Sequence, residues 1–521
     1  MDRRRELHWD RLVQCCASRP GNLLTRLDEV CATRGDHIAL IEDDRRISYR
    51  QLSDEAQNLA SHLAKAGICA GDRVGVMLAN GVDAVRTIWA LLCLGGVVVP
   101  IGTRSRTAEI DLIVGDAGVR LIVHDPVFAS ELGAVGVLLW NVGASDWPAM
   151  LTVSAGPFVA PVQGEHDIFA LLYTSGTTGK PKGVMLTHLN VIHSCLHWID
   201  AQALTADDLT MLCVPWTHVS GLCGVVMPFL YLGATIVVLP VFKRRAALEL
   251  AARERITHAL MVPSMYALCL LEPDLRSFDL SHWRIGAYGG APMPEPTIHR
   301  FAEAVPGLAM CNCYGATETA SAVTIMPPGD GIARADSIGK VVYCGDVRVM
   351  DERGHEVAPG SDGELWIAGP MVAPGYWGNP EATAQSFSGG YWKSGDIGSI
   401  DDGGYVRIAD RKKDMIIRGG FKIYPAEVES VLAAIAGVIE AAVVGQPDLV
   451  LGERVVAFIY SNDANLDEAT VRQFCADRLS DYKVPGVVVL GSEPLPRNAN
   501  GKIQKAVLRL LADALVKQVP S

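Results

Sequence analysis

The chain has 521 residues, which is more than one hydrophobic core usually organises, so we expect at least two domains. Hydrophobic residues make up 49% of the chain and aromatic residues 7%, a balance that excludes a disordered protein and fits a globular α/β protein. The formal net charge of −12 disfavours a general nucleic-acid binder, because such proteins need a positive surface to displace counterions. Anionic substrates must therefore be held by local positive groups.

Strand-like and helical segments alternate along the first part of the chain. The predicted elements are a helix over 49–66, strands over 74–78, 97–101, 121–125 and 235–239, and a helix over 244–254. The long apolar stretch 223–240 is divided by Pro228, Gly233 and Thr235, so it predicts a buried helix, a turn and a strand, not an integral membrane segment. Continuous apolar strands separated by helices indicate an α/β fold with mostly parallel sheets buried on both faces.

The last part of the chain has a different character. A helix is predicted to begin near Pro425, because the proline is followed by acidic residues, and a strand follows it. Residues 466–485 predict another helix, ended by Pro485. We therefore expect a large N-terminal domain over 1–412 and a smaller α+β domain over 413–521.

Cysteine usage indicates the compartment. The chain has 13 cysteines, without a CxxC pair, so we interpret them as reduced thiols of a cytoplasmic protein. Cys311 and Cys313 fit alternation along a strand better than a metal cluster. The N-terminal sequence MDRRRELHWD lacks a following apolar core and does not predict a signal peptide.

The segment LLYTSGTTGKPKGV, residues 171–184, is the strongest functional signal. Glycine lets backbone N–H groups approach an anion closely, hydroxyl groups add donors and lysines add charge, which suits the phosphates of ATP. The pattern GxxxxGK[ST] is absent, because Thr174 and Pro181 stand at positions where it needs glycine and a hydroxyl residue. A flexible linker is the alternative, but the flanking apolar runs predict buried strands.

This segment resembles the signature loop of the acyl-adenylate-forming superfamily, and further blocks that resemble the family follow in its order. They are PWTHVSG from Pro215, GGAP from Gly289, YGATET from Tyr314, GEL from Gly363, SGD from Ser394, DRKKDMIIRGG from Asp410 and PRNANGK from Pro496. The resemblance implies an ATP-dependent ligase that converts a carboxylic acid to acyl-AMP, releases pyrophosphate and passes the acyl group to CoA. A ligase that loads a carrier protein and a non-catalytic binding protein remain alternatives.

The resemblance also implies residue roles around ATP. The candidates for the β- and γ-phosphates are Thr174, Ser175, Gly176, Thr177, Thr178, Gly179 and Lys182. Thr317 would contact the α-phosphate, and Glu318 would hold Mg²⁺. The candidates for the adenine pocket are Gly289, Gly290, Ala291, Tyr314 and Gly315. Asp396 would accept hydrogen bonds from the ribose, with Arg411 supporting it.

Four residues near the C-terminus carry the remaining roles that the resemblance implies. Lys502 would be the catalytic lysine that neutralises charge during adenylation. Lys413 would be the hinge about which the mobile C-terminal domain rotates. Gly419 and Gly420 would line the pantetheine tunnel, although a plain turn is an equal alternative for a Gly-Gly pair.

The acid pocket is the least specific part of the interpretation. Its candidates by position are His197, His218, Val219, Ser220, Gly315, Ala320 and Ser321. His218 would lie between this pocket and the thiol entrance, although a lone histidine is commonly a core residue. Residues 215–226 contain no acidic side chain to pair an ammonium group, which disfavours an α-amino acid. Aryl and aliphatic acids both remain open, and a homodimer is an expectation for the family.

Overall fold

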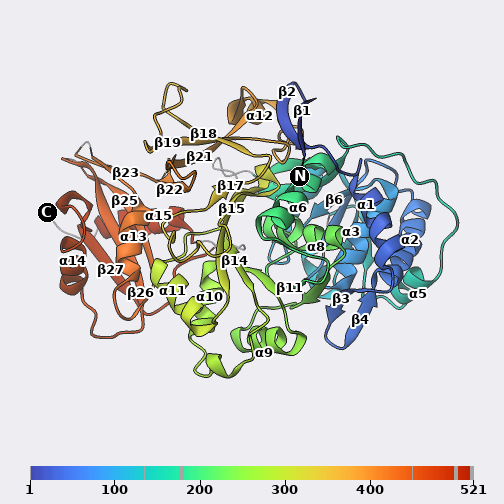
Figure 1. The fold of residues 1–521 in the computed structure, drawn as a ribbon, viewed down its shortest axis with the longest axis horizontal. Coiled ribbons are helices and arrows are strands. Elements are labelled where there is room, and N and C mark those ends of the chain that lie inside the picture. The colour runs from blue at the N-terminus through green and yellow to red at the C-terminus, as the bar shows by residue number, and fades with distance from the viewer. Residues whose placement is uncertain are drawn as a thin grey trace.

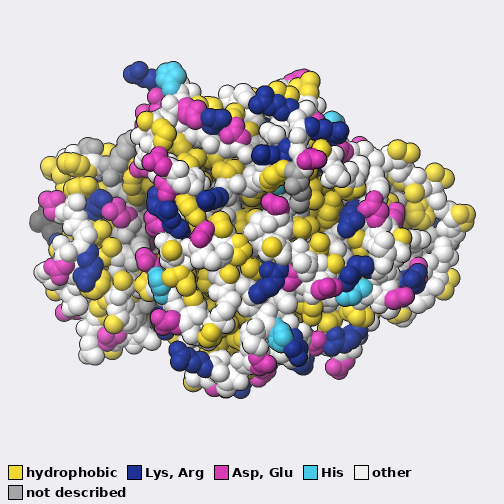
Figure 2. Space-filling model, in the orientation of Figure 1, with side chains coloured by type: hydrophobic (Ala, Val, Ile, Leu, Met, Phe, Trp, Pro, Cys, Tyr) yellow, Lys and Arg dark blue, Asp and Glu magenta, His cyan; other side chains and the backbone are white. Residues whose placement is uncertain are grey.

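The computed structural model describes residues 2–133, 135–174, 181–412, 414–419, 421–448, 450–497 and 503–516. These residues form five β-sheets, and the C-terminal elements gather at one end of an elongated molecule (Figure 1). On the face drawn in Figure 2, basic and acidic side chains are interspersed. That distribution agrees with anion binding by local groups instead of a broad basic surface.

A six-stranded sheet with mostly parallel strands lies in the N-terminal part. Its order is β10-β9-β6-β5-β7-β8, and only β10 runs antiparallel to its neighbour. The strands are β5 (Arg73–Met77), β6 (Val97–Pro100), β7 (Val119–His124), β8 (Leu138–Asn141), β9 (Ile168–Thr174) and β10 (Lys182–Thr187). The strands predicted over 74–78, 97–101 and 121–125 are therefore confirmed.

A nine-stranded sheet forms the second layer of strands. Its order is β17-β16-β15-β14-β13-β11-β12-β3-β4, with a parallel centre and antiparallel edges. The strands are β3 (Ile38–Glu42), β4 (Arg45–Ser48), β11 (Leu209–Leu212), β12 (Thr235–Val238), β13 (His258–Met261), β14 (Ile285–Gly289), β15 (Ala309–Ala316), β16 (Ser321–Ile325) and β17 (Lys340–Val341). The predicted α/β fold with mostly parallel sheets is confirmed.

Helices cover these two sheets. The long ones are α1 (Leu23–Arg34), α2 (Tyr49–Lys65), α3 (Val82–Leu94), α4 (Thr107–Ala117), α6 (His188–Ala201), α9 (Arg244–Glu254), α10 (Pro263–Leu270) and α11 (Glu295–Ala304). Shorter ones are α5 (Trp147–Thr152), α7 (Val219–Gly221), α8 (Met227–Leu232), η1 (Pro126–Leu132), η2 (Leu222–Val226), η3 (Leu275–Ser277) and η4 (Thr317–Thr319). Every residue of α3 except Asp83 is buried, as expected for a helix packed on nearly all sides.

The apolar stretch 223–240 folds as predicted, with one difference. It contains the π-helix η2, helix α8, a left-handed turn at Gly233 and strand β12. The start of the stretch is a π-helix, a form that occurs frequently at functional sites. Among the helices that the structure describes, none has the length and apolar content needed to cross a bilayer.

A smaller antiparallel sheet follows the two large ones. It pairs β18-β19-β21-β20, β22 also pairs with β21, and α12 (Pro380–Ser386) precedes β20. Its strands are β18 (Asp346–Met350), β19 (Gly363–Ala368), β20 (Phe387–Ser388), β21 (Tyr391–Ile400) and β22 (Val406–Arg411). Strands β21 and β22 bring the SGD block opposite the start of the DRKKD block, because Asp396 and Arg411 are register partners.

The C-terminal part has its own sheet and its own apolar clusters. The sheet contains β23 (Ile416–Arg418), β24 (Phe421–Ile423), β25 (Val438–Asp448), β26 (Gly452–Ser461) and β27 (Val487–Gly491), beside α13 (Pro425–Ala433), α14 (Glu468–Ala476), η5 (Asp481–Lys483) and α15 (Lys505–Val516). The helix at Pro425 is confirmed. The helix predicted to continue to Pro485 is too long, because α14 ends at Ala476 and a short 3₁₀ turn precedes the proline.

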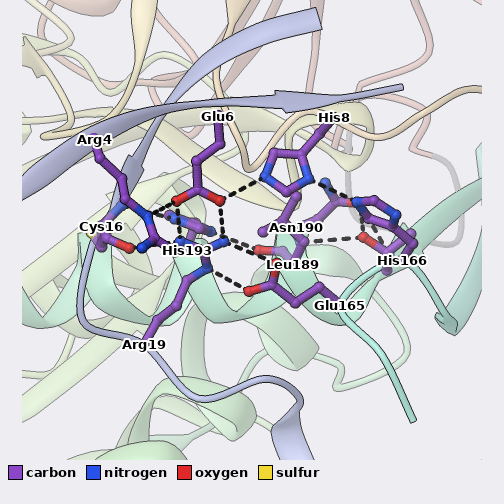
Figure 3. A network of polar contacts seen from close by, with 11 residues as sticks. Arg4, Glu6, His8, Cys16, Arg19, Glu165, His166, Leu189, Asn190 and His193 are labelled. Carbon is purple, nitrogen blue, oxygen red and sulfur yellow. Dashed lines mark hydrogen bonds and ion pairs between the residues drawn. The ribbon is translucent and has the colours of Figure 1, made fainter. Parts of the chain in front are cut away.

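An N-terminal hairpin, β1 (Arg3–His8) and β2 (Arg11–Cys16), was not predicted. A polar network attaches it to the large domain: Glu6 binds Arg19 at 2.7 Å, Arg19 binds Glu165 at 2.5 Å, and His8 contacts His166 at 2.7 Å (Figure 3). The hydrogen bond from Arg19 holds the pKa of Glu6 well below its usual range.

Glu6, His8 and Cys15 place three metal-ligand atoms close together in this hairpin. Glu6 is already paired with a guanidinium, and burial raises the pKa of the Cys15 thiol to about 12. A metal ion would meet positive charge and a protonated thiol there. We therefore interpret the network as the attachment of the hairpin. All 13 cysteines are free thiols, as predicted.

Candidate active site

The phosphate-binding segment begins and ends at the edge of the six-stranded sheet. Thr174 at the end of β9 and Lys182 at the start of β10 are antiparallel register partners. The flanking runs are thus the buried strands that the sequence predicted, and the linker alternative is disfavoured. The predicted phosphate ligands Ser175, Gly176, Thr177, Thr178 and Gly179 lie outside the described residues.

Lys182 and Glu318 meet at a shared aromatic ring, Tyr376. Lys182 Nζ lies 5.0 Å from the centre of the Tyr376 ring, and the Tyr376 hydroxyl donates a 2.8 Å hydrogen bond to Glu318 Oε1. An isolated bridge between Val184 of β10 and Tyr376 fixes this arrangement. Tyr376 was not predicted, because it belongs to none of the sequence blocks that resemble the family. The structure thus brings together the lysine and the carboxylate predicted to serve the phosphates and the metal.

The environment of Glu318 suits a cation. Burial raises the pKa of Glu318, while the Tyr376 hydrogen bond and the charges of Lys182 and Arg411 act in the opposite direction. Because Tyr376 contacts Oε1, the second oxygen can coordinate a hard cation such as Mg²⁺. Thr317, the residue before Glu318 in η4, is half-buried. The residues present therefore fit the predicted metal.

Tyr314, Asp396 and Arg411 form a second constellation. The Tyr314 hydroxyl donates a 2.6 Å hydrogen bond to Asp396 Oδ2, and Arg411 Nε lies 3.2 Å from Asp396 Oδ1. Burial and the neighbouring carboxylate raise the pKa of Tyr314 well above its usual value, so the phenol stays protonated and donates. The Asp396 carboxylate is therefore held in one orientation, as its predicted role toward a ribose requires.

Backbone geometry shapes the adjacent pocket. Gly289 ends β14, and Gly290, with φ of +79°, turns the chain towards Ala291. A Cβ atom at Gly315 would lie 1.8 Å from the carbonyl oxygen of Ser321, so only glycine fits there. These positions let the backbone of two neighbouring strands approach closely beside the Tyr314 ring.

Two successive residues beside Gly315 have strained backbones. Ala320 has φ of +49° and Ser321 has φ of +102°, although neither is glycine. The pairing of β15 with β16 is irregular at this point, between Tyr314 and Gly315. Residues in such sparsely populated regions cluster at ligand-binding sites. The predicted pocket residues Gly315, Ala320 and Ser321 are thus neighbours in the structure.

The other pocket candidates come from α6 and the start of α7. His218 precedes α7, and Val219 and Ser220 form its first turn before the π-helix η2. Helix α6 packs against both η2 and β16, so it joins the two groups of candidates. His197 lies on α6 and is buried. The pocket candidates therefore lie on or next to elements that contact one another, namely α6, η2 and β16.

The C-terminal candidates are only partly described. Gly419 lies in the turn between β23 and β24 with φ of +58°, and its N–H donates to the Leu451 carbonyl at 2.7 Å, so the turn alternative is confirmed for this residue. The tunnel role of Gly419 stays a prediction. Lys413, Gly420 and Lys502 lie outside the described residues. Nearby, Lys412 Nζ lies 3.2 Å from Glu364 Oε2, an ion pair within residues 1–412 just before the predicted boundary.

Two family models match the chain. Residues 27–377 match the model described as AMP-binding enzyme, and residues 427–502 match the model of the AMP-binding enzyme C-terminal domain. The chain belongs to the AMP-binding enzyme family. The resemblance inferred from the sequence blocks is thereby confirmed.

This AMP-binding enzyme is similar to a CoA synthase, a CoA ligase and a protein of solved structure. Feruloyl-CoA synthase of an Amycolatopsis species is 36% identical over 465 residues, which cover 89% of this chain and 93% of that protein. The long-chain-fatty-acid–CoA ligase FadD13 of Mycobacterium tuberculosis is 34% identical over 473 residues, with the same coverage of 89% and 93%. The crystal structure of ATP-bound MatB from Rhodopseudomonas palustris matches with a TM-score of 0.88 and 33% identity, covering 95% of this chain and 99% of that one. The predicted class of activity, AMP-forming ligation of an acid to CoA, is thereby confirmed.

Substitution of Asp396 tests the second constellation. Asp396→Asn should raise KM for ATP about tenfold to a hundredfold, because a charge-assisted acceptor is lost, while KM for the acid changes little. Steady-state pyrophosphate release measures both constants. Asp346→Asn is a matched control, since Asp346 also pairs with an arginine and a tyrosine, Arg348 and Tyr391, but on β18 away from the site. Equal changes in the two variants would contradict the assignment.

Proposed function

We propose that this AMP-binding enzyme activates a compact, aryl-type carboxylic acid as acyl-AMP and then transfers the acyl group to CoA. One observation carries the assignment of the site: Tyr376 connects the cation Lys182 to the carboxylate Glu318 beside the pocket. An aryl-type acid is supported by the 36% identity with feruloyl-CoA synthase and by pocket candidates that are mostly small residues. A long aliphatic acid is the competing class, because FadD13 is nearly as similar.

In the proposed first half-reaction, an oxygen of the acid attacks the α-phosphorus of ATP, and the bond from that phosphorus to the bridging oxygen breaks. Pyrophosphate leaves with the electron pair. Lys182 and the segment after Thr174 would hold its developing charge. Mg²⁺, held by Glu318, would supply further charge neutralisation at the phosphates. Tyr314 and Asp396 would orient the adenine and the ribose, so the α-phosphate stays aligned with the acid.

In the proposed second half-reaction, the CoA sulfur attacks the acyl carbon, AMP leaves, and the thiol proton passes to solvent. Residues 413–521 would rotate about Lys413 between the half-reactions, bringing Gly419 and Gly420 beside the pantetheine. The separate sheet and apolar clusters of this part support a movable unit. A phosphopantetheine on a carrier protein is the alternative acceptor.

A pyrophosphate-release screen tests the proposal. Cinnamic, benzoic, hexanoic and palmitic acids would be supplied with ATP and Mg²⁺, with and without CoA, and the thioester product would be detected by mass. We expect the highest turnover with an aryl acid and thioester only when CoA is present. Preference for palmitic acid would overturn the aryl assignment. Pyrophosphate release without CoA thioester would favour the carrier-protein alternative, and no release with any acid would favour a non-catalytic binding protein.

A further inference from the structure

His197 is a buried histidine without a hydrogen-bond partner. His197 is only 1% exposed, and neither Nδ1 nor Nε2 has a hydrogen-bond partner among the residues that the structure describes. A buried polar group left unpaired lowers the stability of a folded protein. Such a group in a folded protein needs an explanation.

Other buried histidines of the same domain all have partners. His188 Nδ1 accepts from the Leu23 N–H at 3.2 Å, and His258 contacts Thr210 at 2.8 Å and Gln202 at 3.0 Å. His193, one helical turn before His197, accepts from the Cys16 N–H at 3.1 Å and donates to the Leu189 carbonyl at 2.9 Å (Figure 3). The fold therefore supplies both partners to His193 and neither to His197.

The unpaired ring belongs to a turn of α6 whose next residue, Trp198, faces η2 and β16. Its neighbour Trp198 also has an indole N–H without a partner among the described residues. A Cβ atom added at Gly224 of η2 would lie 3.2 Å from both Trp198 Cζ2 and Ser321 Oγ. This turn of α6 thus meets η2, which directly follows α7 with Ser220, and the strained start of β16, which is Ser321.

The ring of His197 is neutral in this setting. Burial and the nearby His193 lower the pKa of His197 well below its usual value. A neutral imidazole offers one N–H donor and one acceptor. That pair suits a hydroxyl or a carbonyl group, whereas a second carboxylate would lose its hydration without gaining a cation.

We propose that His197 binds a neutral hydroxyl or carbonyl group at the end of the acid opposite its reacting carboxylate. This inference rests on the proposed acid activation and deepens it, because it names the substrate class as a polar-substituted aryl acid. His197 is then a specificity-determining residue. An acid without the polar group leaves both ring nitrogens unpaired in the complex, which a site built for a hydrogen bond rejects.

Matched acids test the inference directly. The values of kcat/KM for pyrophosphate release are compared for cinnamic acid and its 2-, 3- and 4-hydroxy derivatives. The wild type should prefer one hydroxylated acid by about tenfold or more, in keeping with one net hydrogen bond. His197→Phe keeps a ring of similar size without its nitrogens. The ratio of kcat/KM for the hydroxylated acid to that for cinnamic acid should therefore fall to about one, because activity on the hydroxylated acid is lost.

A binding readout and a control separate specificity from structure. Without ligand, His197→Phe should have a higher melting temperature than the wild type, because two unpaired buried atoms are removed. The hydroxylated acid should raise the melting temperature of the wild type more than that of His197→Phe. His193→Phe is the matched control: it loses partnered contacts, so its melting temperature should fall while the acid preference is retained.

Three outcomes would overturn the inference. They are no preference for any hydroxylated acid, an unchanged preference in His197→Phe, or the same loss of preference in His193→Phe. Acid-dependent pyrophosphate release without hydroxyl preference would defeat this inference alone. Absence of release with every acid would defeat the proposed function, and the melting-temperature comparison would then still decide whether His197 binds the polar group.

Discussion

Replacing Lys502 with alanine should abolish acyl-AMP formation while acyl transfer from supplied acyl-AMP to CoA continues. The resemblance of PRNANGK to the family block assigns Lys502 to the charge that grows between the carboxylate and the α-phosphate, and this charge develops only during adenylation. Loss of one such electrostatic group costs about 10²–10³-fold in rate. Pyrophosphate release measures the first half-reaction, and thioester formation from synthetic acyl-AMP measures the second.

Lys505 provides the control for Lys502. Lys505 Nζ lies 2.8 Å from Glu429 Oε1, and the same oxygen accepts a 2.7 Å hydrogen bond from the Val443 N–H. Lys505→Ala should therefore lower the stability of the C-terminal part and leave the ratio of the two half-reactions unchanged. Equal loss of both half-reactions in Lys502→Ala, or loss of neither, would contradict its catalytic assignment.

Replacing Glu318 with glutamine should decrease pyrophosphate release by about 10²–10³-fold, because the site loses the charge that holds the cation at the phosphates. The same substitution should stabilise the ligand-free protein at neutral pH. Burial raises the pKa of Glu318, so the charged carboxylate is penalised in the folded state. Glutamine has nearly the same shape and no charge.

The pH dependence of stability follows because the pKa of Glu318 is raised in the folded protein. Below the pKa of the unfolded chain, about 4.3, Glu318 is protonated in both states and the two proteins should melt at similar temperatures. As pH rises through the raised pKa of folded Glu318, the wild type loses stability relative to Glu318→Gln. The difference in melting temperature should therefore grow towards neutral pH.

Glu381 provides the control for Glu318. It is exposed on α12, so Glu381→Gln should alter neither turnover nor the pH dependence of melting. The assignment would be contradicted if Glu318→Gln kept normal turnover. It would also be contradicted if a higher Mg²⁺ concentration changed the turnover of Glu381→Gln and of Glu318→Gln by the same factor.

Much of the fold could be predicted from hydrophobic patterns. The runs around Val76 and Val123 are continuous and apolar, which is typical of parallel strands covered on both faces, and both became central strands. Helix α9 was predicted with the bounds that the structure has. These elements bury large apolar surfaces, so the pattern of side chains and the packing agree.

The errors occurred where local pattern and packing disagree. The hairpin β1–β2 is polar in sequence. Its position depends on Arg19, which lies just after β2, and on Glu165, which is far away in the chain. Helix α14 ends at Ala476 before its apolar pattern does. Tyr376 has no motif of its own, and only folding brings it to Glu318, 58 residues earlier in the chain.

The sequence by itself determined the family, the kind of reaction and the residue types at the nucleotide site, because glycine, hydroxyl and charged residues at fixed spacing reflect the chemistry of phosphates. It could not determine which polar groups are satisfied, since hydrogen-bond partners come from distant segments. In the sequence, His193 and His197 are two histidines of the same helix, and nothing distinguishes their surroundings. Tertiary structure decided that the Cys16 N–H reaches one ring while neither nitrogen of the other has a partner among the described residues, and our proposal for His197 rests on that difference.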